Sequence, residues 1–131
     1  MAEVEAAEPE TDVSVVKRVR KFEGVVDVPG SEGITIQALA MASKTEGETI
    51  LNRCASTPVV RRFAEQLAGF GISVSFEDET ATVISGDATT PNGEVVAESI
   101  ETYAALAGLS VGRSVILTGD ESFKAEAARI L

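Results

Sequence analysis

Two kinds of hydrophobic spacing alternate along the sequence, and this alternation limits the fold more than any other feature. Strand-like stretches, with apolar residues at every second position or in β-branched runs, occur at 22–28, 48–52, 72–76 and 80–84. Between the first three, apolar residues recur at helical spacing over 34–42 and 58–70. Helices of this kind must bury their apolar side against a sheet, so the order strand, helix, strand, helix, strand, strand predicts an α/β fold.

Beyond residue 87 the same pattern begins again. It predicts a helix, a strand and a last helix over 100–109, 115–117 and 123–131. Because no closing pair of strands follows, we expect one complete βαβαββ unit over about 20–86 and an incomplete one over about 87–131.

The charge of the chain limits its partners. It has 21 acidic and 11 basic residues, a formal net charge of -10. Nucleic-acid binding depends on clustered Lys and Arg that release counterions, so we expect no nucleic-acid partner. The basic cluster within 17–21 is interpreted as solvated surface. Residues 1–12 are rich in acids and have no apolar period, which predicts a disordered acidic tail before a folded domain over 13–131.

Cysteine and histidine usage argues against metal and redox chemistry. Cys54 is the only cysteine and the sequence has no histidine, so neither an internal disulfide nor a Cys–His site is possible. We expect a cytoplasmic setting, no cofactor, no metal and, without a run of ~18 apolar residues, no membrane partner. One alternative stays open, in which Glu32, Glu98 and Glu101 hold Mg²⁺ or Ca²⁺, although their spacing matches no metal-loop motif.

Three stretches of the chain carry motifs. Residues 26–39 read VDVPGSEGITIQAL, residues 47–52 read GETILN, and residues 117–123 read LTGDESF. They resemble the PGSKS-I-S-x-R-A-L, G-x-S/T-x-L-x-N and LTGDESL segments of 5-enolpyruvylshikimate-3-phosphate (EPSP) synthase, in the enolpyruvyl transferase family. Their order and spacing agree over about 20–131. The resemblance implies a fold of βαβαββ units with the helices inside, of which this chain would supply the opening part.

The resemblance also implies which residues remain of a substrate site. The family brings together a shikimate phosphate and phosphoenolpyruvate, so its site needs positive charge. The family's Lys, Ser and Arg fall on Glu32, Gly33 and Gln37, while Ser31 and Thr35 keep hydroxyl groups. Two cations are therefore missing and a carboxylate stands in one place, which opposes phosphate binding. We expect these five positions to be remnants of a substrate site.

Two cations persist further along the chain. The family's D-D-T-R becomes PVVR, where Arg61 remains, and its basic run after the third motif leaves only Lys124. Its Gly-Asn-Ser/Ala-Gly-Thr turn has no counterpart in 94–101, and Glu101 falls nearest the Arg that follows that turn. The family's general acid and base lie in its other domain, so the resemblance implies no catalytic residue in this chain.

Three functions stay open at this level. The leading hypothesis is a non-catalytic domain, a pseudoenzyme, that keeps the scaffold for protein interaction or assembly. The chain could instead be a fragment or subunit of an EPSP synthase-type enzyme completed by other chains, or a small-molecule sensor that uses the remodelled cleft. An incomplete unit would expose sheet edges and an apolar helix flank, so we expect a homo-oligomer or another protein chain as partner.

Overall fold

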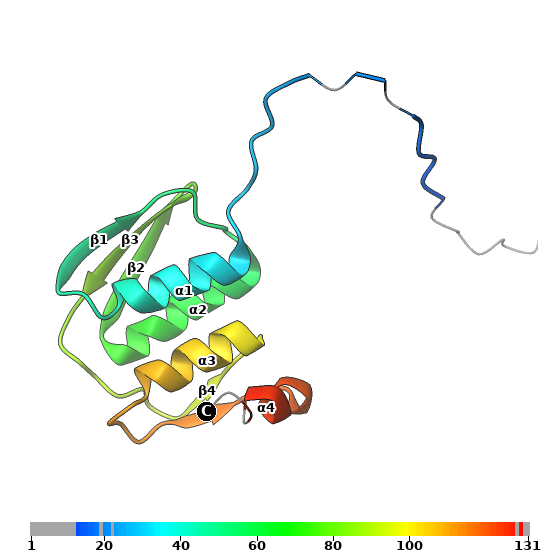
Figure 1. The fold of residues 1–131 in the computed structure, drawn as a ribbon. Coiled ribbons are helices and arrows are strands. Elements are labelled where there is room, and N and C mark those ends of the chain that lie inside the picture. Colours follow the sequence, from blue (N-terminus) through cyan, green and yellow to red (C-terminus); the bar gives the residue numbers. More distant parts are fainter. Residues whose placement is uncertain (1–12, 19, 22, 128, 130–131) are drawn as a thin grey trace, which may run out of the picture.

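The computed structural model describes residues 13–18, 20–21, 23–127 and 129, and it has the predicted α/β composition. Strands and helices alternate along the chain (Figure 1). In order they are α1 (Glu32–Ala42), β1 (Gly47–Leu51), α2 (Pro58–Leu67), the 3-10 turn η1 (Ala68–Phe70), β2 (Ile72–Glu77), β3 (Thr80–Ser85), β4 (Glu94–Val96), α3 (Ile100–Leu109), β5 (Ile116–Thr118) and α4 (Glu121–Ala127). No helix in the described part of the chain is long and apolar enough to cross a membrane.

The first sheet is antiparallel, with β3 in the centre between β1 and β2. The predicted hairpin is confirmed: β2 turns into β3 at Asp78, whose φ of 51° lies in the left-handed region. Alternation along the strands separates the two faces. Thr49, Val83 and Val74 pair across the sheet on its buried face, whereas Ser73 and Ser75 are exposed on the other. The helices therefore cover one face of this sheet.

The second sheet consists of β4 and β5, which pair in parallel through the crossover helix α3. Figure 1 shows α1, α2 and α3 between the two sheets, with α4 beside α3. One apolar cluster fills the space among them. The α2 helix turns an apolar stripe inward, whereas α1 is apolar on more than one side, with Ile34 and Met41 left exposed. Its fully buried members include Ile36, Leu39, Val60, Phe63, Leu67, Val83 and Leu106.

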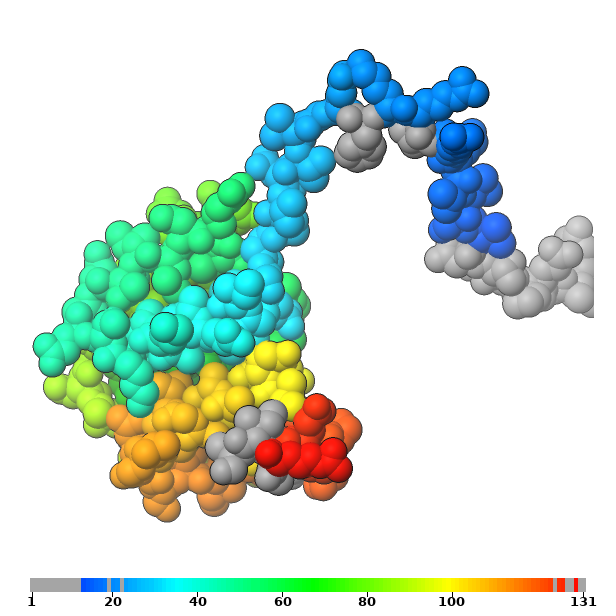
Figure 2. Space-filling model, in the orientation of Figure 1, coloured from blue at the N-terminus to red at the C-terminus, as the bar shows by residue number. Residues whose placement is uncertain are grey.

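The strand predicted over 22–28 is wrong for the residues that the structure describes. Residues 23–28, like 13–18 and 20–21, have no regular structure. We call the described residues of 13–28 the arm; Figure 2 shows them standing clear of the body. Alternating valines specify an apolar face but not a pairing partner, and the arm valines remain 69% to 97% exposed. Among the described residues, the first unit therefore has no opening strand.

Other boundaries differ in small ways. The last helix begins at Glu121, two residues before the predicted start, since Asp120 accepts a hydrogen bond from the backbone N–H of Ser122 at 2.8 Å. Its predicted end at 128 and 130–131 lies outside the described residues, as does the predicted tail over 1–12. The short strand β4 was not predicted.

Candidate functional site

The N-termini of α1, α2 and α3 meet at one end of the helix layer, where the sequence motif predicted a site. Thr57, which caps α2, donates a hydrogen bond from its hydroxyl to the Glu32 carboxylate in the first turn of α1. Arg62 of α2 donates from Nη1 to Oε1 of Glu98, just before α3, at 2.6 Å. These two contacts join three helix starts. Each start has the positive end of a helix dipole and a hydroxyl cap, from Ser31, Thr57 or Ser99.

The loop before α1 is held against the strand end by close backbone packing. A Cβ atom on Gly30 would lie 2.2 Å from the carbonyl oxygen of Arg53, so only glycine fits. Ser31 caps α1. Thr35 is 4% exposed, and its Oγ1 donates to the carbonyl of Ser31 at 2.8 Å and accepts the N–H of Ala55 at 2.9 Å. The hydroxyls of Ser31 and Thr35 therefore form hydrogen bonds with backbone groups of the chain itself.

Carboxylates surround the point where the helices meet. Glu32 and Glu101 lie in the first turns of α1 and α3, where a negative charge complements the helix dipole. A Cβ atom on Gly33 would lie 3.8 Å from Cγ of Glu101, so the two helix starts are close neighbours. Within the described residues no group of three potential ligands is arranged to hold a metal ion, so Glu32, Glu98 and Glu101 give the cation alternative no support.

The remaining predicted positions do not join this cluster. Gln37 is exposed on α1, about a turn beyond Gly33. Arg61 donates to Oγ of Ser56 at 2.6 Å, and its guanidinium lies 5.5 Å from the ring centroid of Phe76 on β2. Its side chain is thus turned toward the sheet edge. The backbone of Lys124 belongs to α4, but the placement of its side chain is outside the described structure.

Sequence reasoning missed two members of the site. Arg62 was overlooked because the family motif aligned only Arg61, yet Arg62 is the cation that reaches the cluster. Thr57 caps α2, and its contact with Glu32 has no local sequence signal because the two residues belong to different helix starts.

Cys54 lies beneath the same loop and is 4% exposed. Its Sγ donates to the carbonyl of Leu51 at 3.5 Å. Burial raises the pKa of the thiol, since the charged thiolate loses solvation, while a backbone hydrogen bond from Ala81 acts in the opposite direction. A buried, protonated thiol is a packing group and a poor nucleophile.

Two hollows flank the first sheet. One, of about 210 Å³, lies between α1 and the end of β1 and includes Ser31, Thr35 and Cys54 in its lining. The other, of about 490 Å³, lies between α2 and the edge strand β2. We call it the α2–β2 groove; its lining includes Arg61, Ala64, Glu65, Ala68, Ile72, Val74 and Phe76.

Comparison with known proteins gives a distant similarity. No family model matches the chain. Curated proteins named 3-phosphoshikimate 1-carboxyvinyltransferase, from Escherichia coli O9:H4 (strain HS) and from Shigella dysenteriae, are 25% and 26% identical to it over 118 residues. The alignments cover 81% of this chain and 27% of each relative, so the chain spans about a quarter of the relatives' length. The similarity supports a distant relationship to EPSP synthase and fits the α/β fold.

Proposed function

We propose that this chain is a non-catalytic relative of EPSP synthase that acts as a protein-interaction or assembly module. The proposal rests mainly on the position and contact of the Glu32 carboxylate. It occupies the first turn of α1, where three helix N-termini meet, and it accepts a hydrogen bond from Thr57 of α2. A protein carboxylate thus takes the position that helix starts otherwise offer to a phosphate.

The electrostatics of this end of the molecule oppose an anionic substrate. Glu32, Glu98 and Glu101 bring three carboxylates to the helix starts, and Arg62 is already paired with Glu98 at 2.6 Å. A phosphate near Glu32 would meet a like charge, which costs more than a missing hydrogen bond. Catalysis of enolpyruvyl transfer requires the opposite arrangement, since charge develops on anionic groups.

Two positions at which the family has arginine, Gln37 and Arg61, support the same proposal. Gln37 is uncharged and exposed. Arg61 keeps its charge, but its contacts with Ser56 and Phe76 direct it toward β2. The helix starts are instead joined by the Thr57–Glu32 hydrogen bond and the Arg62–Glu98 ion pair, and such contacts can stabilise a scaffold.

Calorimetric titration with shikimate 3-phosphate tests this proposal. We expect no binding by the wild-type chain at millimolar ligand. The double variant Glu32→Lys, Gln37→Arg restores two cations and should bind the ester at least about tenfold more tightly than the wild type. The control Glu46→Lys, Asn92→Arg makes the same change in net charge at two exposed positions and should not bind. Micromolar binding by the wild type would disprove the proposal.

A second candidate is an enzyme subunit, favoured by a similarity that extends over 81% of the chain. It requires partner chains that provide the acid, the base and the missing cations. Enolpyruvyl transfer that appears only when this chain is mixed with such partners would establish it. A stable complex without activity would favour the module instead.

A further inference from the structure

The α2–β2 groove has the construction of a site for an extended peptide. On one side, β2 is an edge strand: it pairs with β3, and no other described strand lies beyond it. On the other side, α2 contributes Ala64 and the following turn η1 contributes Ala68, one helical turn further on. Small side chains on the helix leave room beside the strand, and the hollow measures about 490 Å³.

The strand side of this groove is apolar and incompletely covered. Ile72, Val74 and Phe76 alternate along β2 toward the helix layer; Ile72 is buried, but Val74 and Phe76 stay half-exposed. An added strand would pair with the open backbone edge and cover these side chains, which is the usual manner of β-strand addition. An uncovered edge of this type otherwise invites uncontrolled pairing.

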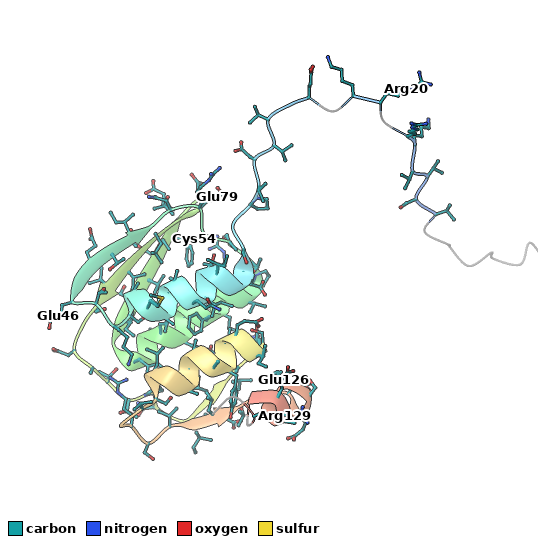
Figure 3. All side chains as sticks on the ribbon, in the orientation of Figure 1. Arg20, Glu46, Cys54, Glu79, Glu126 and Arg129 are labelled. Carbon is teal, nitrogen blue, oxygen red and sulfur yellow. The ribbon has the colours of Figure 1, made fainter. Side chains whose placement is uncertain are left out.

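The arm has the complementary properties. Val13, Val15 and Val16 are 72%, 78% and 92% exposed, and Figure 3 shows Arg20 on the arm, away from the body. In a strand, Val13 and Val15 would share one face. The following residues Lys17, Arg18, Arg20 and Lys21 add four positive charges, and no acid occurs within 13–21.

Charge fixes the direction in which the arm would lie. β2 ends in Glu77, and the turn after it adds Asp78 and Glu79, all three exposed; Figure 3 shows Glu79 at this end of the sheet. If the arm runs parallel to β2, its valines lie along the apolar start of the strand and its basic residues meet the acidic turn. The antiparallel direction would separate these charges.

The arm is tied at its base to its own body, with Asp27 and Arg53 3.3 Å apart at the end of β1. The six residues before Asp27 span roughly 20 Å when extended, enough to reach a neighbouring molecule. In the single chain the arm extends away from the body (Figure 2). Each copy thus offers one arm and one groove, and a two-fold dimer uses both pairs at once.

We propose that residues 13–21 of one copy add as a parallel strand to β2 of a second copy, and reciprocally, to form an arm-exchanged homodimer. The proposal rests on the function as an interaction module and identifies its partner as a second copy of the chain.

Sedimentation of the full chain tests the exchange. We expect a dimer that the variant Val13→Asp, Val15→Asp weakens by about tenfold or more, because two buried apolar groups become charged. Neither residue belongs to the packed body, so the variant should fold. The control Val26→Asp, Val28→Asp has the same charge, spacing and initial exposure but lies outside the pairing segment, and it should dimerise like the wild type. A monomeric wild type, an unaffected dimer, or equal sensitivity to the control would each overturn the proposal.

A peptide experiment locates the contact. A synthetic peptide of residues 13–21, added to the isotope-labelled Val13→Asp, Val15→Asp chain, should shift the backbone amide resonances of 72–77. Shifts at 47–51 in their place, or none, would contradict the assignment to β2. These outcomes are independent of shikimate 3-phosphate binding, so a failure here is distinguishable from a failure of the non-catalytic function.

Discussion

The Thr35 side chain connects the loop before α1 to the segment after β1 through two hydrogen bonds made by one buried hydroxyl. Replacing Thr35 with valine keeps the shape but leaves the N–H of Ala55 and the carbonyl of Ser31 without this partner. We expect Thr35→Val to lower the free energy of unfolding by about 1–3 kcal/mol. Urea denaturation of the wild type and the variant measures this loss. The exposed loop residue Thr90 is the control, and a Thr90→Val loss as large as that of Thr35→Val would refute this role.

The buried thiol of Cys54 should make the free energy of unfolding depend on pH in the alkaline range. Burial raises the pKa of its thiol in the folded state, whereas in the unfolded chain the thiol ionises near its ordinary pKa, about 8.5. Below that pH both states hold the proton and nothing changes. Above it the unfolded state loses the proton first, so the free energy of unfolding falls as pH rises through the folded pKa. Urea denaturation from pH 7 to 10 should show that the free energy of unfolding declines less in Cys54→Ala than in the wild type. Identical declines in the two proteins would contradict this role of the thiol.

At the scale of elements, Gly71 ends the helical segment, and β2 begins at the next residue. The φ of Gly71 is 84°, and a Cβ atom there would lie 1.9 Å from the carbonyl oxygen of Asp87. We predict that Gly71→Ala costs more than about 2 kcal/mol, the sum of left-handed strain and a backbone clash. Gly93 has nearly the same φ, 86°, but open space around it, so Gly93→Ala isolates the strain alone. Equal losses of stability in the Gly71→Ala and Gly93→Ala variants, measured by thermal unfolding, would contradict the prediction, because they would show that the backbone moves to relieve the clash at Gly71.

The elements differ in how well the sequence predicts them. The helices α1, α2 and α3 and the β2–β3 hairpin were predicted closely because apolar residues at helical spacing and alternating side chains are local signals. The strand at 22–28 failed for the opposite reason, since a strand exists only with a partner and the sequence does not say which edge it joins. β4, three residues long, is defined mainly by its parallel pairing with β5.

At the scale of the whole molecule, Glu32 and Gly33 lie where the three helix starts converge. That they are remnants of a substrate site stays a prediction. Arg61 does not reach the helix starts, because its side chain stacks on Phe76, and the cation that arrives instead is Arg62. Which of the two arginines reaches the helix starts depends on packing between segments distant in sequence, and a single motif carries no information about that packing.

We propose that this end of the molecule rejects shikimate 3-phosphate, the phosphorylated carboxylic acid that an EPSP synthase must hold. A crystal of the full chain soaked with shikimate 3-phosphate tests it directly. We predict no density for the ester beside Glu32 and Gln37, with the Glu32–Thr57 and Arg62–Glu98 contacts unchanged. An ordered ester at that position, with its phosphate directed at the N-terminus of α1, would contradict the account.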